Sequence, residues 1–557
     1  MTANAPPPSF LSAPRGCSLR DFQLLTINGI VTAVNKLPDK QSVSDPLPTR
    51  LLKDNVDILA PFLVELMNRC LLSGSVPTQF KVSCITPRLK KTDLDAADPK
   101  SYRPIANLSV LSKLLERLVA QQLVAYLNSS RLLPRLQSAY RAYHSTETAV
   151  TKVLGDILLA LDDGNISMLT LLDLSAAFDT VDHDILLHRL EISYGLGGAV
   201  LSWFRSYLDS RTQSVCYGSS TSDPALVMFG VPQGSVLGPI LFLLYTADLL
   251  KLIERHNLHP HAYADDTQIY GFCAPSDAVQ LQSQMSACVD EVASWMSSNR
   301  LLLNTAKTEV LWCSTSRRQH QIPQSRTRIG NDYVTTATSV RDLGIHIDSD
   351  VSMKSHVSRT VSTCFAALRQ INSIRRCLPQ QALVSLVVSL VHTRLDYGCS
   401  TLAGLPANSI NRLQSVLNAA ARLVFSSRKH HRVSPLLQRL HWLKMEQRIE
   451  YKLALLVYRC LHGLAPPYLA NELQPVSTLD TRRALRSSTT NALVVPPTRL
   501  STVGDRAFPV AAARVWNSLP VSVTSSATLN TFKQRLKTEL FIRCYDLPSP
   551  YARKHSV

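Results

Sequence analysis

The sequence predicts an α+β protein made of several structural units. Apolar residues recur at helical spacing in the first 130 residues and again after Gly344, whereas short apolar runs typical of buried strands occupy the stretch between them. The chain has 557 residues, which is too long for a single hydrophobic core. Because 45% of the residues are hydrophobic, we expect most of the chain to fold.

The N-terminal third begins with a proline cluster and then becomes helical. Residues 1–20 lack periodicity, and we expect them to be disordered. Residues 55–72 carry an apolar stripe at helical spacing, and residues 109–127 carry a second one. The stripe of the first helix consists of Leu59, Phe62, Leu63, Leu66 and Met67.

The middle third is where strands are expected. Residues 167–172 form a short apolar run that ends in Asp173, as in a buried strand that delivers a carboxylate. Residues 261–270 read as two short strands joined at Asp265-Asp266. Between these segments, residues 230–244 pair a glycine-rich turn with an apolar helix.

Helices dominate the sequence after Gly344. An apolar stripe predicts one helix over 410–424, which a basic run at 428–432 follows, and another helix is predicted over 445–462. Residues 471–557 have no predicted fold.

The charge of the chain favours a polyanionic partner. Its 59 Lys and Arg residues against 41 Asp and Glu residues give a net charge of +18. Nucleic acid is the commonest partner of such a protein, although a basic protein without a particular ligand is the alternative. The 12 cysteines include no C-x-x-C pair. This pattern argues against a zinc knuckle and a disulfide framework and is typical of a reducing compartment.

No targeting or membrane segment is apparent. The N-terminus lacks the pattern of a signal peptide, and the best apolar stretch, 382–391, is too short to cross a bilayer. We therefore expect an intracellular, soluble protein with no membrane partner.

Three aspartates are candidate metal ligands. Magnesium prefers hard oxygen ligands and is usually bound through one or two carboxylates plus substrate phosphates. Asp173, Asp265 and Asp266 lie where strands end or turn, which suits such a site. An Asp-Asp pair by itself is more often a solvated turn, and this is how we interpret Asp162-Asp163-Gly164.

The order of three segments adds specificity. LDLSAAFD at 172–179, GVPQGSVLGP at 230–239 and YADD at 263–266 resemble motifs A, B and C of reverse transcriptases, in the form found in LINE-type (non-LTR) retrotransposons. The resemblance extends over roughly 40–545. Further matching segments are YRPI at 102–105 with Lys113 and Glu116, HSTETA at 144–149, WFRSYL at 203–208, LNTAKTE at 303–309, LGI at 343–345, GDRAF at 504–508 and WNSLP at 516–520.

The resemblance implies a right-hand polymerase with an antiparallel-sheet palm. On this basis we expect an N-terminal extension at 1–49, fingers at 50–165, the palm at 166–345, a helical thumb at 346–470, and a C-terminal extension of unknown fold at 471–557.

The resemblance also implies an RNA-directed DNA polymerase. It would extend a primer 3′-hydroxyl with dNTPs on an RNA template, using two Mg²⁺ ions, or Mn²⁺ in their place. Asp173, Asp265 and Asp266 would bind the metals. The nearby carboxylates Asp179, Asp182 and Asp184 are better explained as helix caps and surface.

Further roles follow from the matched motifs. Phe178 would lie under the sugar and exclude a 2′-hydroxyl, although it could be an ordinary core residue. Gln233, Gly234 and Tyr263 belong to segments that contact the substrate, although the first two also read as a turn before a helix. Arg103 would bind the triphosphate, assisted by Lys90 or Lys91. Lys307 would protonate the leaving pyrophosphate, although an exposed lysine is the plain alternative.

Basic residues after the palm are candidates for gripping the template and primer. These residues are Arg422, Arg428, Lys429 and Arg432. A solvated helix face is the competing interpretation. The implied partners are an RNA template, a DNA primer or target, and dNTPs, with nuclear action implied by the family.

The sequence also departs from the family pattern. It lacks the endonuclease domain that usually precedes the polymerase. Three explanations are open: a fragment of a longer element, a 5′-truncated genomic copy, or a protein that depends on an endonuclease supplied in trans. The main alternative is a degenerate retroelement copy that only binds nucleic acid. A related polymerase class, such as a group II intron maturase or telomerase, is a further alternative.

Overall fold

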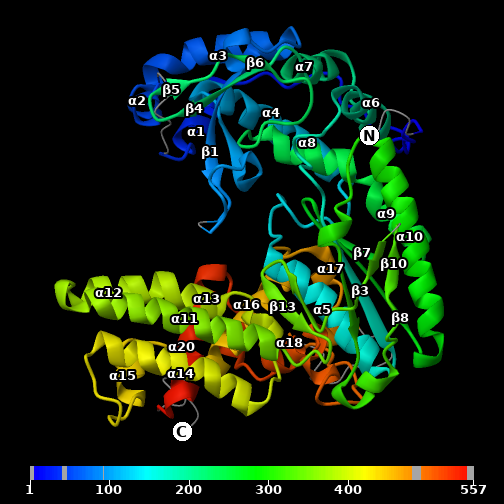
Figure 1. The fold of residues 1–557 in the computed structure, drawn as a ribbon. Helices are drawn as coiled ribbons and strands as arrows, with labels where there is room; N and C mark the ends of the chain where they lie inside the picture. Colours follow the sequence, from blue (N-terminus) through cyan, green and yellow to red (C-terminus); the bar gives the residue numbers. More distant parts are fainter. Residues whose placement is uncertain are drawn as a thin grey trace. The chain divides into compact units, whose positions relative to one another are not determined.

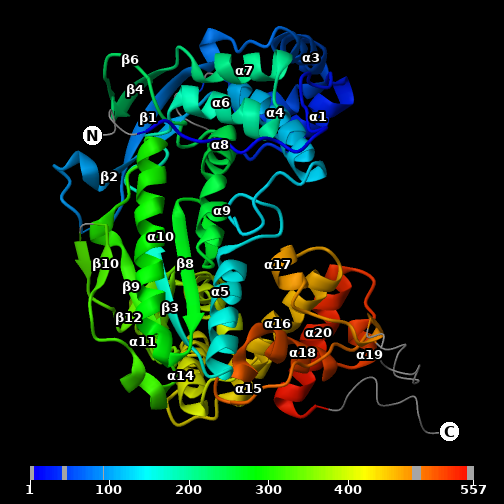
Figure 2. The same ribbon diagram turned by 90° about the vertical axis from the view of Figure 1, so that its right-hand side faces the viewer.

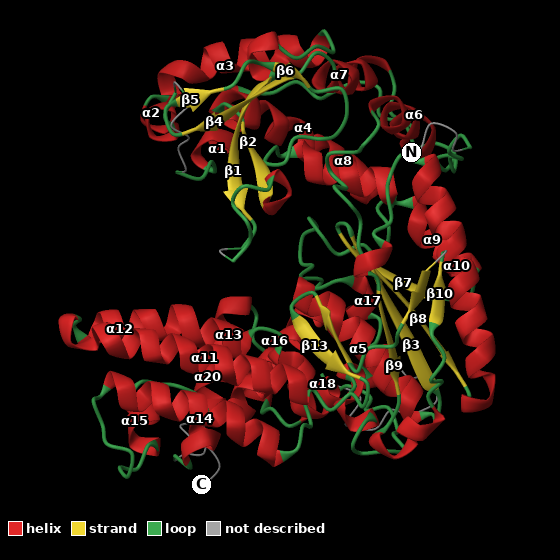
Figure 3. Ribbon diagram, viewed as in Figure 1, coloured by secondary structure: helices red, strands yellow, loops and turns green. Residues whose placement is uncertain are grey.

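The computed structural model describes residues 6–39, 45, 47–91, 93–330, 332–478 and 491–547. The chain divides into two compact units, each assembled from three stretches of sequence. Unit 1 comprises residues 1–140, 173–256 and 287–306, and unit 2 comprises residues 141–172, 257–286 and 307–557. Both units combine helices and strands, so the predicted α+β class is confirmed (Figures 1 and 3).

Unit 1 contains a mixed sheet with the strand order β2-β1-β4-β5, in which β6 also pairs with β4. Strands β1 and β2 are antiparallel, and β1 and β4 are parallel. A disulfide joins Cys84 of β1 to Cys216 of β4, which the cysteine spacing did not predict. The strands are β1 (Val82–Leu89), β2 (Tyr102–Asn107), β4 (Thr212–Tyr217), β5 (Ser220–Thr221) and β6 (Ala225–Leu226).

Helices make up the rest of unit 1. Both helices predicted in the first 130 residues are present, as α3 and α4. The inward face of α3 differs from the prediction, because Val56, Ala60, Leu63 and Met67 are buried whereas Phe62 is 72% exposed. The helices are α1 (Ile27–Asn35), α2 (Thr49–Asp54), α3 (Val56–Leu72), α4 (Val110–Ser129), α6 (His183–Tyr194), α7 (Gly198–Leu208), α8 (Leu237–Thr246) and α9 (Asp248–Arg255), together with part of α10 (Ala278–Ser298).

The N-terminal segment is ordered from residue 6 onward. Its backbone bonds to the last turn of α6 and to the C-cap of that helix: Ala13 N donates to the Ile192 carbonyl at 2.8 Å, and Leu19 N donates to the Gly195 carbonyl at 3.0 Å. The prediction of disorder is therefore wrong for residues 6–20, because this proline-rich segment satisfies its backbone through partners about 175 residues away. Residues 1–5 lie outside the described residues.

Unit 2 is built around an antiparallel sheet with the order β7-β8-β3-β9. The predicted strands are present as β3 (Ile166–Leu172), β7 (His259–Tyr263) and β8 (Asp266–Cys273), and β9 (Glu309–Cys313) completes the sheet. Helix α5 (Thr146–Asp162) packs against β3 and β7 and runs beside the sheet (Figure 2). Six of the seven residues of β3 are buried, which explains why its sequence is mostly apolar, with only Ser167 and Thr170 polar.

Two small hairpins follow the sheet. They are β10 (Thr327–Ile329) with β11 (Asp332–Val334), and β12 (Ser339–Asp342) with β13 (Ile345–Asp348). The β12–β13 turn consists of Leu343 at φ +43° and Gly344 at φ +91°. Two consecutive left-handed residues are the geometry of a tight two-residue hairpin turn.

The remainder of unit 2 is helical, as predicted (Figure 3). The apolar stripe predicted for α14 is buried as expected, from Ile410 to Val424. The helices are α11 (Lys354–Ile374), α12 (Gln380–Val387), the π-helical turn η7 (Val388–His392), α13 (Thr393–Asp396), α14 (Ala407–Val424), α15 (Ser434–Arg439), α16 (Met445–Leu461), α17 (Pro467–Ala470), α18 (Phe508–Asn517), α19 (Val521–Thr524) and α20 (Leu529–Tyr545).

The described residues beyond 470 are part of the core of unit 2. Helices α18 and α20 pack on α16, and α18 also packs on α5. At the end of α5, the Asp162 carboxylate accepts the backbone N–H groups of Arg499 and Leu500 at 2.6–3.1 Å. Asp162 is therefore a buried cap for a distant segment and not a solvated turn residue.

Among the described helices, none is both long enough and apolar enough to cross a membrane.

Candidate active site

Asp173 follows the last residue of β3 and is held by Asn304. The side-chain amide of Asn304 donates to Asp173 Oδ2 at 3.1 Å, and its backbone N–H donates to the Asp173 carbonyl at 2.9 Å. Leu174 and Leu303 form an antiparallel bridge next to this contact. Asn304 thus fixes the orientation of the carboxylate, a role that sequence reasoning did not assign to it.

Asp265 and Asp266 lie at the tip of the β7–β8 hairpin. Tyr263 pairs with Asp266, so that Ala264 and Asp265 form the turn. Asp265 is partly exposed and Asp266 is exposed, whereas the residues that follow them in β8 are buried. Ala264 adopts φ +59°, a conformation that is uncommon for a residue with a side chain but usual at the first position of a two-residue hairpin turn.

The register of the sheet relates this tip to β3. Leu172, the last residue of β3, pairs with Thr267, the residue after Asp266. The C-terminal end of β3 and the tip of the β7–β8 hairpin therefore lie at the same end of the sheet of unit 2.

In unit 1 the motif A loop is bound to the motif B turn. Gln233 donates its amide to both oxygens of Asp179, at 3.1 and 3.2 Å, and Val231 N donates to the Phe178 carbonyl at 2.9 Å. Burial raises the pKa of Asp179, whereas the Gln233 hydrogen bond and the charge of Lys90 oppose this rise. Asp179 is exposed, as the sequence interpretation expected, and its carboxylate is bound by Gln233 of the motif B turn.

Phe178 is partly exposed, and its ring stacks on Phe242 of α8 with centroids 4.5 Å apart. The two other carboxylates near motif A agree with the sequence interpretation. Asp182 is the N-cap of α6 and accepts from Ile185 N at 3.0 Å, and Asp184 is exposed in the first turn of that helix.

Gly234 connects the motif B turn to strand β2. The Gln233 carbonyl accepts the Ala106 N–H at 2.7 Å, and Gly234 has φ +123°. A Cβ at Gly234 would lie 2.4 Å from the Ala106 carbonyl oxygen, so only glycine fits without a backbone shift. This glycine therefore lets the backbone of the motif B turn approach strand β2 closely. Arg103 is exposed on that same strand.

Glu116 is a buried residue that sequence reasoning matched to the family but gave no role. It is 1% exposed on α4, and its Oε2 accepts the N–H groups of Val236 and Leu237 at 2.6 and 3.0 Å. These are orphan donors at the start of α8, where a carboxylate also complements the helix dipole. Burial raises the pKa of Glu116, and the two N–H donors and Arg211 oppose the rise.

The candidate lysines differ in their surroundings. Lys90 donates to the Lys100 carbonyl at 2.7 Å and acts electrostatically on Asp179, which favours Lys90 over Lys91 as the lysine nearest the motif A loop. Lys307 is exposed in the short 3₁₀ turn η4 (Thr305–Lys307).

A basic groove lies beside the β12–β13 turn in unit 2. It has a volume of about 780 Å³, and Leu343 and Gly344 are part of its wall. Three exposed arginines line it, namely Arg341 of β12, Arg359 of α11 and Arg394 of α13, and no acidic side chain does. The sequence analysis did not identify these arginines, because they come from three separate elements.

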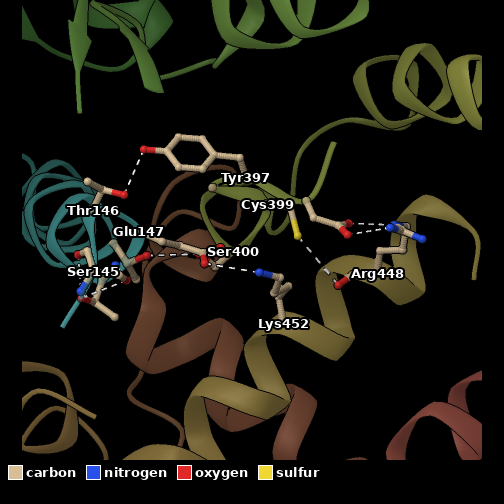
Figure 4. Close-up of polar contacts among 12 residues, drawn as sticks. Ser145, Thr146, Glu147, Tyr397, Cys399, Ser400, Arg448 and Lys452 are labelled. Carbon is tan, nitrogen blue, oxygen red and sulfur yellow. Dashed lines mark hydrogen bonds and ion pairs between the residues drawn. The ribbon is translucent and has the colours of Figure 1, made fainter. Parts of the chain in front are cut away.

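Tyr397 ties this groove to α5. Its O–H donates to the Leu343 carbonyl, and its oxygen lies 3.0 Å from the Thr146 hydroxyl (Figure 4). The Tyr397 ring also packs 3.1 Å from the position that a Cβ on Gly344 would take. Burial raises the pKa of Tyr263, and the proximity of Tyr397 adds to this rise. Tyr397 is thus near both the groove and the β7–β8 hairpin.

Ion pairs reinforce this junction (Figure 4). Arg448 of α16 donates two hydrogen bonds to Asp396, at 2.8 and 2.6 Å, and Lys452 lies 3.4 Å from Glu147. Ion pairs therefore connect α13, which forms part of the groove wall, to α16, and connect α16 to α5.

The basic residues predicted to grip nucleic acid lie on a different element. Arg422 is in the last turn of α14, and Arg428, Lys429 and Arg432 are exposed in the loop between α14 and α15. Arg422 donates to the His431 carbonyl at 3.5 Å, which connects the helix end to this loop.

The described residues contain no group of three His, Cys, Asp or Glu side chains that could hold a metal ion. The oxygen donors of Asp173, Asp265 and Asp266 nevertheless have the chemistry that Mg²⁺ prefers, with its remaining ligands coming from substrate phosphates and water.

Comparison with protein families shows what the middle part of the chain is similar to. Residues 89–347 match the model of the family described as "Reverse transcriptase (RNA-dependent DNA polymerase)". All three catalytic motif segments lie within this range. The chain therefore contains a reverse transcriptase domain.

Curated relatives specify the kind of reverse transcriptase. The chain is 28% identical over 411 residues to the "Probable RNA-directed DNA polymerase from transposon BS" of Drosophila melanogaster, covering 72% of this chain and 44% of the relative. It is 29% identical over 357 residues to the corresponding protein of the transposon X-element of that species, covering 62% and 38%. It is 23% identical over 414 residues to the polymerase of the mobile element jockey, covering 73% and 44%.

These relatives confirm the resemblance to LINE-type, non-LTR retrotransposon polymerases, and the chain spans less than half of their length. Among solved structures, a telomerase from Candida albicans matches with a TM-score of 0.36 and 12% identity over 69% of this chain and 67% of the other, which is too weak to support an argument.

Proposed function

We propose that this chain is an RNA-directed DNA polymerase of a non-LTR retrotransposon, which extends a primer 3′-hydroxyl with dNTPs on an RNA template. The observation that carries the proposal is the position of Asp265 and Asp266 at the tip of a hairpin whose strand β8 pairs with β3. The register Leu172–Thr267 directs the strand that precedes Asp173 toward the same end of the sheet.

The reverse transcriptase family uses divalent metal ions, and we propose two Mg²⁺ ions here. Asp173, Asp265 and Asp266 are the residues that hold them. When bound, the ions favour the ionised primer hydroxyl and neutralise charge on the leaving pyrophosphate. The Asn304 hydrogen bond keeps the Asp173 carboxylate in one orientation, which limits the reorganisation needed on binding.

Unit 1 supplies the nucleotide contacts in this proposal. Arg103 binds triphosphate oxygens, since an exposed guanidinium can pair with two of them at once. Phe178 lies under the sugar and excludes a 2′-hydroxyl, with its ring supported from behind by Phe242. Gln233 and Gly234 contact the incoming nucleotide and the template base, and the hydrogen bond from Ala106 N to the Gln233 carbonyl holds their backbone.

Two residues of unit 2 complete the chemistry. Tyr263 borders the metal-binding hairpin, and Lys307, which is exposed, donates a proton to the leaving pyrophosphate. No covalent enzyme intermediate is needed, because the 3′-hydroxyl attacks the α-phosphate in line.

The basic groove is the proposed contact with the template–primer backbone. Arg341, Arg359 and Arg394 present three positive charges around the Leu343–Gly344 turn without an opposing carboxylate in the lining. Arg422 at the end of α14 and Arg428, Lys429 and Arg432 in the loop after it are proposed to make further contacts with the template–primer backbone. Contacts of this kind weaken steeply with salt.

The domain plan proposed from sequence is retained: fingers at 50–165, palm at 166–345, thumb at 346–470 and a C-terminal extension at 471–557. We propose a DNA primer or target, an RNA template and dNTPs as partners. Strand nicking by an endonuclease in trans and action in the nucleus belong to the same proposal.

The test is primer extension on an RNA template with dNTPs and Mg²⁺. We expect extension by the parent protein and none by the variant Asp265→Ala, Asp266→Ala. The exposed Asp163→Asn variant, which removes a carboxylate outside the motifs, is the matched control and should extend normally.

The other outcomes each overturn part of the proposal. A folded parent that binds RNA without extending the primer would support the degenerate-copy alternative. Equal extension by the parent and the double variant would show that the metals bind elsewhere. An absolute requirement for intron RNA would favour a maturase.

A further inference from the structure

A buried carboxyl–carboxamide contact lies directly behind the proposed metal-binding hairpin. Gln268 is on β8, two residues after Asp266, and Asp342 is the last residue of β12. The Gln268 amide Nε2 donates to Asp342 Oδ1 at 2.5 Å. The two residues are 1% and 3% exposed, so water cannot replace this bond.

The other oxygen atom of each of these two side chains has no hydrogen-bond donor. Gln268 Oε1 and Asp342 Oδ2 are both buried and have no hydrogen-bond partner among the described residues. If Asp342 were ionised, both atoms would be acceptors, and each would carry the cost of an unpaired buried group.

A neutral Asp342 removes this conflict. The carboxylic acid then has an O–H group, which is the kind of donor that Gln268 Oε1 lacks. Burial, with a contribution from Asp266, raises the pKa of Asp342 to about 7, which is consistent with a substantial neutral fraction at physiological pH.

The pair connects two functional elements. On one side, Gln268 shares strand β8 with Asp266, and side chains two residues apart on a strand point to the same face. On the other side, Asp342 precedes the Leu343–Gly344 turn, which lines the basic groove and is held by Tyr397. The register of β12 with β13 (Asp342 opposite Ile345) keeps this turn tight.

We propose that Asp342 and Gln268 form a neutral carboxylic acid–carboxamide pair that positions the Asp265–Asp266 hairpin against the groove turn. Both are positioning residues, since neither is proposed to touch metal or substrate. The inference rests on the proposed polymerase function, because its role is to orient two of the proposed metal ligands.

The Asp342→Asn and Asp342→Leu variants test the protonation state. Asparagine is nearly isosteric with the neutral acid and supplies both the acceptor and a donor, so this variant should keep primer extension within about twofold of the parent. Leucine leaves the Gln268 amide unpaired. It should lower kcat by about 10- to 100-fold, the usual effect of losing a residue that orients metal ligands, and raise the Mg²⁺ concentration needed for half-maximal rate. The KM for dNTP should change little.

Exchange of the two groups provides the rescue. Gln268→Glu alone places two carboxyl groups together and should lower kcat to a similar extent. Adding Asp342→Asn restores one acid and one amide with exchanged places, and it should recover most of the lost rate. A purely structural role predicts that the apolar double variant Gln268→Leu, Asp342→Leu recovers kcat together with the melting temperature. A positioning role predicts recovery of the melting temperature alone.

The proposal is overturned if Asp342→Asn is as impaired as Asp342→Leu, or if the exchanged pair gives no rescue. Failure of the polymerase proposal is recognised separately, by absence of extension in the parent. In that case the melting temperatures still test the pair. Asp342→Asn should melt like the parent and Asp342→Leu clearly below it, and equal melting of the two variants would overturn the neutral pair itself.

Discussion

Replacing Gly234 with alanine should break the contact between the motif B turn and strand β2. The added Cβ would lie 2.4 Å from the Ala106 carbonyl oxygen, and that oxygen is backbone, so it cannot rotate away. The residue also has φ +123°, which side chains rarely tolerate. Either the turn or β2 must therefore shift.

The expected cost has two parts. The strained backbone conformation costs about 1–3 kcal/mol for a residue other than glycine. Forcing an extra methyl group into a packed site costs about 1–3 kcal/mol more. The sum of about 2–6 kcal/mol is a large part of the roughly 5–15 kcal/mol that stabilises a typical domain.

Gly218→Ala is the matched control. Gly218 also lies in unit 1 and has φ +61°, but a Cβ there would meet no atom within 4 Å. It should lose only the strain of a left-handed conformation, about 1–2 kcal/mol. Urea unfolding of the two variants therefore separates strain from steric overlap.

Nucleotide binding should also be impaired more in Gly234→Ala than in Gly218→Ala. A shift of β2 against the turn moves Arg103 relative to Gln233, so the KM for dNTP should rise at least about tenfold in Gly234→Ala and little in Gly218→Ala. Equal unfolding free energies for the two variants would refute the steric argument. An unchanged KM in a clearly destabilised Gly234→Ala protein would refute the link between this contact and nucleotide binding.

Three further predictions concern separate parts of the molecule. Asn304→Ala should reduce kcat about tenfold or more, because the Asp173 carboxylate loses the hydrogen bond that orients it. The same change should lower the free energy of unfolding by up to about 1.5–3 kcal/mol, the usual worth of a hydrogen bond to a charged group. An unchanged kcat would show that Asp173 needs no such support. Arg359→Ala and Arg394→Ala should each reduce the salt dependence of template–primer binding by about one unit of log–log slope. Lys354 is on α11 but outside the groove lining, so Lys354→Ala should leave the slope nearly unchanged. Equal effects of all three substitutions would contradict specific binding in the groove. Burial raises the pKa of Glu472 from its usual 4.5 to about 7 against the opposing effect of Lys152, so its native state binds the proton more tightly than its unfolded state. This stabilising contribution is fully present below about pH 4.5 and is lost as the pH rises to about 7. The total loss is about 3 kcal/mol in the free energy of unfolding. In Glu472→Gln, the free energy of unfolding measured by urea unfolding should depend less on pH over that range.

Local patterns explain what the sequence predicted well. The strands that carry Asp173 and the Asp265–Asp266 hairpin are short apolar runs with turn residues at their ends, and such signals depend only on neighbours in the chain. The stripe of α14 was equally clear, because its seven buried positions follow the helical repeat from Ile410 to Val424. The buried face of α3 was predicted less well. Phe62 is apolar and was therefore expected to be buried, but it is exposed.

Long-range polar contacts explain what the sequence could not predict. Glu116 caps a helix 120 residues later, and Asn304 holds an aspartate 131 residues earlier. The sequence spacing around Glu116 and Asn304 does not predict these contacts, because the partners of Glu116 are backbone N–H groups and the partner of Asn304 lies in another motif. The signal available was a charged residue within an otherwise apolar helical face, which for Glu116 indicates a satisfied buried group.

The Asp162 cap has a consequence for how the protein is made. Its backbone partners at Arg499 and Leu500 are synthesised 337 and 338 residues after it. At roughly 5–20 residues per second, the ribosome needs roughly 15–70 s to cover that distance. During this time the end of α5 has emerged but its buried carboxylate has no partner and its α18-facing surface is uncovered. Unit 2 therefore cannot complete its core on the nascent chain until almost the whole polypeptide has left the ribosome, and premature termination would leave an apolar surface open to aggregation or to chaperones.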